Sequence, residues 1–100
     1  ADLVSISTGT FISQTNHGLG ATERVIFEGT AQSSINYNGT GARIYTNLTN
    51  ITYAAPYSFT IASLAGITDA APGGSVYRLK QDTVVAGSVF VGTTFSNCFP

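Results

Sequence analysis

Few side chains in this sequence are suited to acid–base or nucleophilic chemistry. The chain has one histidine, His17, and one cysteine, Cys98, besides five carboxylates. Nucleophilic catalysis needs a base beside the nucleophile, and general acid–base catalysis needs titratable groups that converge. His17 lies within the glycine-rich turn 16–20, Asn-His-Gly-Leu-Gly, where we expect its ring to hold the loop by a hydrogen bond. We therefore predict that the chain has no catalytic residue and is not an enzyme.

The carboxylates are also poorly placed for catalysis. Glu23 and Glu28 are five residues apart on a predicted strand, and side chains alternate between the two faces of a strand. They therefore point to opposite faces and cannot form a catalytic pair. Arg24 shares a face with Glu28, with Ile26 between them, and we expect a surface ion pair or an interface contact there.

Composition and spacing exclude several classes of ligand. One His, one Cys and scattered carboxylates lack the spacing of metal ligands, so we predict no metal site. The glycine-rich stretches 18–20 and 72–74 do not open a helix, as a phosphate-binding loop would, so we predict no cofactor. The four basic residues are too few and too dispersed to bind nucleic acid. No apolar run approaches the roughly 20 residues of a membrane-spanning helix, so we predict no membrane contact.

The elements that position these residues are predicted to be strands. Hydrophobic residues recur with a period of two, most clearly at 57–62, where Tyr57, Phe59 and Ile61 share one face. Weaker runs of the same kind lie at 3–8, 10–15, 24–29, 34–37, 42–46, 50–53, 75–79 and 83–91. Turn signals separate the runs at short intervals, and the unpatterned stretch 63–74 is predicted to be a loop. We therefore predict an all-β fold: a single compact β-barrel or β-sandwich of about eight short antiparallel strands.

The surface chemistry is unusual for a soluble protein. Only 9% of the 100 residues are charged, against roughly a quarter in average domains. Most polar side chains are instead hydroxyls and amides, from fourteen Thr, ten Ser, six Asn and three Gln. The hydrophobic fraction of 43% suffices for one core, and we predict a single β domain over residues 1–100. A surface so poor in charge indicates that much of it contacts other protein.

The string from Asn16 to Gly29, NHGLGATERVIFEG, resembles a pattern of tailed-bacteriophage virion proteins. In that pattern His-Gly-Leu leads through a turn into a strand that reads Val-x-Phe-x-Gly. It belongs to a small β-barrel-like module of tail, fibre and capsid-surface proteins that also occurs in ubiquitin-activating enzymes. The positions that match are His17, Gly18, Leu19, Val25, Phe27, Gly29, Tyr53, the strand 56–61 and the pair Gly73-Gly74. The usual Gly-Asp before the second strand is Thr22-Glu23 here, so the turn type must differ. The region 31–48 also matches poorly.

The resemblance, which covers roughly residues 10–78, implies a structural role in a virion. We expect a capsid decoration (cement) protein on the surface of the phage particle, because 100 residues fit a complete small protein. Its partners would be the major capsid protein or other virion subunits, and homotrimers are usual for such proteins. Unprotected strand edges on a surface poor in charge agree with this expectation.

The candidate partner-binding residues are apolar side chains near the chain ends and in one loop. They are Leu3, Val4 and Ile6, the loop residues Leu64 and Ile67, and the carboxy-terminal Phe95 and Phe99. The alternative is a tail-fibre or tailspike domain that binds a host-surface receptor or glycan through tyrosines amid Asn and Thr loops. Those tyrosines are Tyr37, Tyr45, Tyr53, Tyr57 and Tyr77, which could equally rim the core as ordinary strand residues.

Overall fold

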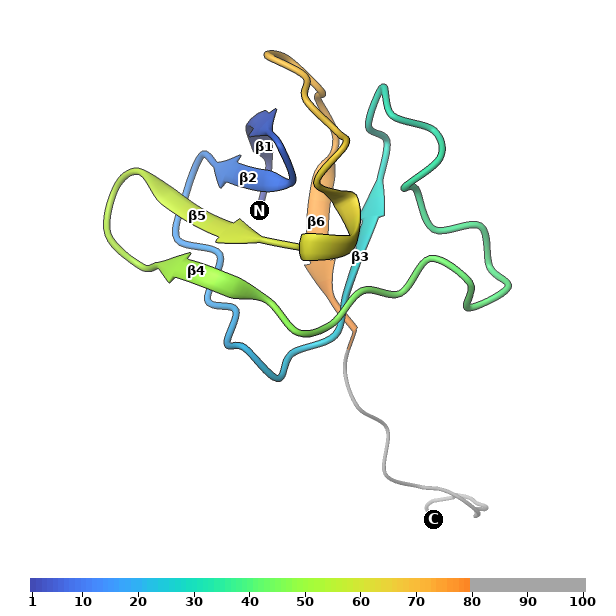
Figure 1. Ribbon diagram of the computed structural model, residues 1–100, viewed down its shortest axis with the longest axis horizontal. Coiled ribbons are helices and arrows are strands. Elements are labelled where there is room, and N and C mark those ends of the chain that lie inside the picture. Colours follow the sequence, from blue (N-terminus) through green and yellow to red (C-terminus); the bar gives the residue numbers. More distant parts are fainter. Residues whose placement is uncertain (80–100) are drawn as a thin grey trace, which may run out of the picture.

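The computed structural model describes residues 1–79, and the prediction of an all-β fold is confirmed over that range (Figure 1). Six short strands and one turn of 3-10 helix follow one another along the chain. In order these are β1 (Leu3–Ser7), β2 (Thr10–Ser13), β3 (Val25–Glu28), β4 (Thr49–Thr52), β5 (Tyr57–Thr60), η1 (Ala62–Leu64) and β6 (Ser75–Arg78).

Four strands form one antiparallel sheet in the order β1-β2-β5-β4. β1 and β2 form a tight hairpin whose two turn residues, Thr8 and Gly9, have φ values of 47° and 79°. Two consecutive positive φ values define a turn that matches the twist of the flanking strands, which fixes the register Ser7↔Thr10. The register between β2 and β5 then places Phe11 directly opposite Phe59.

The second sheet is the antiparallel pair β3-β6, in which Phe27 lies opposite Val76. The amino-terminal residues connect the two sheets, because Leu3 N donates to Gly74 O at 3.1 Å and Val76 N donates to Ala1 O at 2.9 Å. Farther along β1, the backbones of Ile6 and Asp69 exchange two bonds of 2.8 Å. The outer edge of β1 is therefore largely covered, although neither sheet closes into a barrel.

The core lies between the two sheets and is centred on three phenylalanines. The ring of Phe11 stacks on Phe27 with 4.6 Å between centroids and on Phe59 with 5.3 Å. Strand alternation explains this arrangement, because Phe27 points inward from β3 while Phe11 and Phe59 point inward from β2 and β5. The remaining buried apolar side chains of the core are Leu3, Ile6, Leu19, Val25, Ile35, Leu48, Ile61 and Val76.

Two predicted strands are absent from the described residues. The runs 34–37 and 42–46 contribute only isolated bridges, from Asn36 to Phe27 and from Tyr45 to Val25. The Asn36 amide instead bonds the backbone and hydroxyl of Thr30, which holds this stretch as a turn. The predicted strand 83–91 lies outside the described residues, so neither the count of eight strands nor a barrel or sandwich is confirmed.

The predicted loop 63–74 needs one correction at its start. Ser63 and Leu64 belong to η1, which Figure 1 shows directly after β5. The backbone N–H of Leu64 donates to Ile61 O at 3.0 Å, and that of Ala65 donates to Ala62 O at 3.2 Å. Such short-range bonds close a 3-10 turn without needing an amphipathic pattern, which is why the sequence showed no periodicity there.

Candidate functional site

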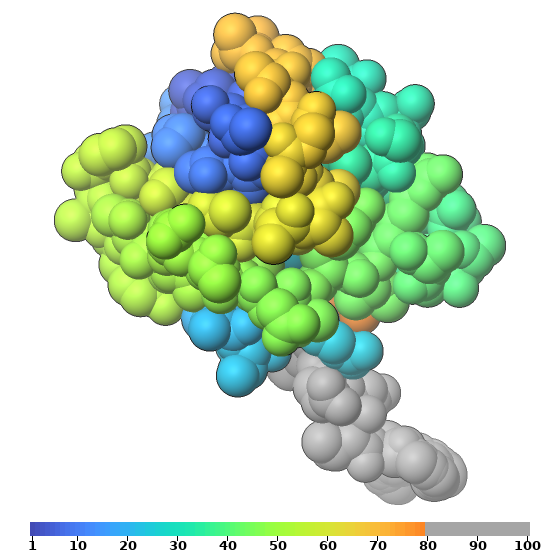
Figure 2. Space-filling model, viewed as in Figure 1, coloured from blue at the N-terminus to red at the C-terminus, as the bar shows by residue number. Residues whose placement is uncertain are grey.

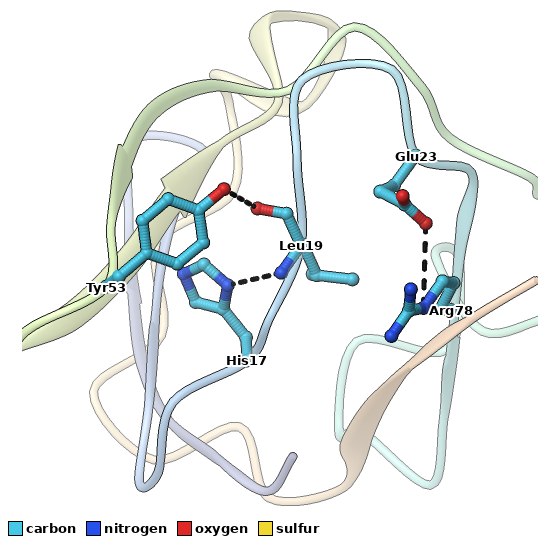
Figure 3. A network of polar contacts seen from close by, with 5 residues as sticks. All are labelled: His17, Leu19, Glu23, Tyr53 and Arg78. Carbon is cyan, nitrogen blue, oxygen red and sulfur yellow. Dashed lines mark hydrogen bonds and ion pairs between the residues drawn. The ribbon is translucent and has the colours of Figure 1, made fainter.

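His17 fastens the turn 16–20 to β5. The backbone N–H of Leu19 donates to His17 Nδ1 at 3.0 Å, and Nε2 lies 2.8 Å from Ser58 O. Since Nδ1 accepts a hydrogen bond, Nε2 carries the proton and donates it to the Ser58 carbonyl. The expected loop-holding role is confirmed, and both ring nitrogens contact backbone atoms; Figure 3 shows the bond with Leu19. Cys98, the only thiol, lies outside the described residues.

Tyr53 secures the same turn from the other side. Its hydroxyl donates to Leu19 O at 2.7 Å, so both polar backbone atoms of Leu19 are bonded to side chains (Figure 3). The His17 ring packs edge-on against Phe59 at 5.3 Å and at a tilt against Tyr53 at 5.6 Å. This cluster therefore immobilises a loop, and it presents no free base for catalysis.

The ion pair found in residues 1–79 differs from the expected one. Glu23 Oε1 lies 3.5 Å from Arg78 Nε, whereas the sequence suggested a pair between Arg24 and Glu28. Residues four apart on an extended strand are about 13 Å apart along the chain, too far for direct contact. The pairing of β3 with β6 instead places Arg78 opposite Val25, within reach of Glu23. This pair is exposed and contributes about 0–1 kcal/mol.

Asp69 joins three segments of the chain. Its carboxylate accepts hydrogen bonds from Gln32 Nε2 at 2.9 Å and from the backbone N–H of Ala71 at 3.0 Å. The bond from Gln32, and next that from Ala71, hold the pKa of the Asp69 carboxyl below its ordinary value of 3.8. Because its backbone also pairs with Ile6, Asp69 positions the segment before β6 against β1.

The candidate partner-binding residues are not all on the surface. Leu3 and Ile6 are in the core, with 7% and 1% of their surface exposed, so a partner cannot reach them. Both can point inward, although they are three residues apart, because the register of β1 with β2 is interrupted between Leu3 and Ser5. Val4 points outward and is 48% exposed. Leu64 and Ile67 are half-buried against the core. Phe95 and Phe99 lie outside the described residues.

The outer face of the β3-β6 pair carries two apolar side chains that were not among the predicted partner-binding residues. Ile26 and Tyr77 lie directly opposite each other, and Tyr77 is 51% exposed. Their neighbours Val25, Phe27 and Val76 are buried, so alternation sends this pair outward. The signal was present in the sequence, where Ile26 sits between two core positions and Tyr77 directly follows one.

A surface pocket of about 380 Å³ lies between the segments 44–47 and 61–63. Its lining residues are Ile44, Tyr45, Thr46, Asn47, Ile61, Ala62 and Ser63. Burial raises the pKa of the Tyr45 phenol above its ordinary value of 10.0, and Arg43 offsets part of this rise, so the hydroxyl keeps its proton at neutral pH. Figure 2 shows the green 44–47 segment beside the yellow 61–63 segment on the viewed face. No sequence motif signalled this pocket, because its two walls are remote along the chain.

Residues 1–79 contain no cluster of three or more His, Cys, Asp or Glu side chains that could hold a metal ion. The same residues form no helix with the length and apolar character needed to span a membrane. Comparison with known proteins finds no matching family, no matching curated protein and no matching solved structure. The functional inference therefore depends on the surface chemistry of the chain and on the resemblance in residues 16–29.

Proposed function

We propose that this chain is a structural virion protein of a tailed bacteriophage, a capsid decoration protein that stabilises the capsid by bridging its subunits. The observation that carries the proposal is the apolar pair Ile26 and Tyr77, which faces outward in a chain with only 9% charged residues. Val4 adds a further exposed apolar side chain on β1. Ordinary soluble domains cover such positions with charge, whereas interfaces are depleted of charge and enriched in tyrosine.

The area of a stable interface shows that the pair Ile26 and Tyr77 needs many neighbouring contacts. A stable interface buries about 800 Å² on each partner, far more than one cross-strand pair provides. Ile26 and Tyr77 would act as the central anchor. The polar rim would include Arg24 and Glu28, which flank Ile26 on the same face, together with nearby hydroxyls and amides. The partner is the major capsid protein or another virion subunit, and the chain itself associates as a homotrimer at the particle surface.

Strand edges bear on how such an assembly is built. β4 is the open edge of the four-stranded sheet, and it carries no charged side chain. Its register with β5 is interrupted between Thr49 and Thr52, where Asn50 has a φ of 50°. A bulge of this kind discourages indiscriminate strand pairing. We therefore assign the capsid contact to the outer face of β3-β6 and not to the β4 edge.

Attachment to capsids tests this assignment. Replacing Tyr77 or Ile26 by Ser should abolish binding to capsids that lack the protein, while Thr49→Ser, at an exposed position on β4, should leave binding intact. Deleting residues 1–8 would be uninformative, because it removes β1 and two core residues. Wild-type copy number should reach hundreds per particle. Unchanged attachment of both Ser variants, with their circular dichroism preserved, would refute the assigned surface.

A tail-fibre or tailspike domain is the alternative function. The pocket beside Tyr45 favours it, since tyrosine with neighbouring amides is typical of surfaces that recognise glycans or protein loops. Tyr53 is less suited to this role, because its hydroxyl is already bonded to Leu19 O. Copy number separates the two functions: a few to a few dozen copies per particle would indicate a tail component.

A further inference from the structure

The pocket between 44–47 and η1 contains an asparagine amide that has no hydrogen-bond partner among residues 1–79. Asn47 lines the pocket, and its side chain makes no hydrogen bond to any residue in 1–79. The other asparagines of this range all use their side chains in hydrogen bonds within the protein: Asn16, Asn36, Asn38 and Asn50. No group within residues 1–79 therefore competes with a ligand for the donors and the acceptor of the Asn47 amide.

The rest of the lining is mixed in polarity and carries no charge. Ile44 supplies aliphatic surface and Tyr45 supplies an aromatic ring, while Thr46 and Ser63 add hydroxyls; Ile61 forms the buried floor. Arg43, next to this segment in the chain, directs its guanidinium to backbone carbonyls elsewhere, at 2.9 and 3.1 Å. A charged ligand would therefore find no counter-ion among the residues that line the pocket.

The walls of the pocket are held by backbone hydrogen bonds. Tyr45 exchanges two such bonds with Val25 of β3, at 2.8 and 2.9 Å. On the opposite wall, η1 begins after Ile61, whose N–H donates to Gly9 O at 2.9 Å. Asn47 adopts a φ of 59°, a left-handed conformation that asparagine tolerates well. The backbone that carries the polar groups of the pocket is thus held in place before a ligand binds, which lowers the entropic cost of binding.

We propose that this pocket binds a single neutral saccharide unit. A sugar ring combines an apolar C–H face, which suits the Tyr45 ring and the aliphatic wall, with hydroxyls that pair with the Asn47 amide and Ser63. The volume of about 380 Å³ lies in the range of about 300–1,000 Å³ typical of small-molecule sites. The biological role of this site rests on the tail-fibre or tailspike alternative, whereas the binding is a property of the chain alone.

Binding is tested on the full chain by recording backbone amide NMR spectra during titration with glucose, galactose, mannose and N-acetylglucosamine. At least one of these sugars should shift the resonances of 44–47 and 61–63 in a saturable manner. Asn47→Gly removes the amide while keeping the left-handed backbone, and should raise the dissociation constant about fivefold. Asn50→Gly is the matched control, because Asn50 is also exposed, has a φ of 50° and does not line the pocket. Ser63→Ala provides a second weakening variant.

Three results would overturn the proposal. The first is the absence of shifts with all four sugars to the limit of solubility, and the second is an equal effect of Asn47→Gly and Asn50→Gly. The third is perturbation of the same resonances by the capsid protein but by none of the sugars, which would make the pocket a protein contact. Each is independent of copy number, so the saccharide site and the virion role can fail separately.

Discussion

Two adjacent glycines allow the cost of a close backbone approach to be separated from the cost of left-handed geometry. Gly73 and Gly74 have nearly equal φ values of 67° and 68°. A Cβ on Gly74 would lie 2.5 Å from both Glu28 O and Thr30 N, whereas a Cβ on Gly73 would have no such neighbour within 4 Å. Alanine at the two positions therefore differs only in whether the added carbon meets other backbone.

The two substitutions should differ clearly in magnitude. Left-handed geometry costs an L-residue about 1–2 kcal/mol, which is all that Gly73→Ala should lose. Gly74→Ala adds an overpacking cost of about 1–3 kcal/mol, because backbone atoms must shift, for a total of about 2–5 kcal/mol. The affected atoms lie at the end of β3 and in the two residues after it. Because Gly74 O also accepts from Leu3, the shift would loosen the junction between the two sheets.

Urea unfolding at equilibrium measures this difference. Unfolding is followed by tyrosine fluorescence and by circular dichroism, since the chain has five tyrosines and no tryptophan. The difference between the two variants should also appear as a lower Tm, at about 4–8 °C for each kcal/mol in a domain of this size. Equal losses for both variants, or a larger loss for Gly73→Ala, would refute the close approach of Gly74 to the end of β3.

Three further substitutions probe the polar contacts. Tyr53→Phe keeps the ring but removes the hydrogen bond to the turn 16–20, and should lower the free energy of unfolding by about 0.5–1.5 kcal/mol in urea titrations. His17→Ala removes two hydrogen bonds and should lower it by about 1–3 kcal/mol; a loss no larger than that of Tyr53→Phe would contradict the two-sided role of the ring. The folded-state pKa of Asp69 is depressed, so its stabilising effect is fully present above the ordinary value of 3.8 and is lost as pH falls through the folded-state pKa. Asp69→Asn should therefore be less stable than wild type at pH 7, because an amide has one acceptor oxygen and cannot accept from both Gln32 and Ala71 as the carboxylate does. The difference in free energy of unfolding between variant and wild type should narrow below pH 3.8, and a difference that persists in acid would contradict this.

Strand alternation carried most of what could be predicted about the fold. At 57–61 the apolar positions are separated by Ser58 and Thr60, and the structure places β5 there with Phe59 and Ile61 buried. The stretch 34–37 shows a similar alternation around the buried Ile35, yet it is a turn. A period of two cannot distinguish a strand from a turn that buries one side chain, and here side-chain hydrogen bonds decide the outcome.

Long-range pairing explains what the sequence did not reveal about the candidate sites. The pocket exists because Tyr45 pairs with Val25, which brings 44–47 to η1, and no local pattern encodes that pairing. The placement of Leu3 and Ile6 was missed for a related reason. The segment before β6 covers the edge of β1, so a strand that looks terminal in the sequence has neighbours on both sides.

The pairing of the amino terminus with β6 also constrains how the chain acquires its structure. The backbone N–H of Val76 donates to Ala1 O across a sequence separation of 75 residues, and Ser75 Oγ donates to Asp2 across 73. The β1-β2 hairpin can form early from local contacts, but its outer edge stays open until β6 has been synthesised. Folding dominated by such distant pairings is slow and leaves strand edges exposed meanwhile. During synthesis on the ribosome, the edge of β1 is therefore open to aggregation until residue 76 has emerged.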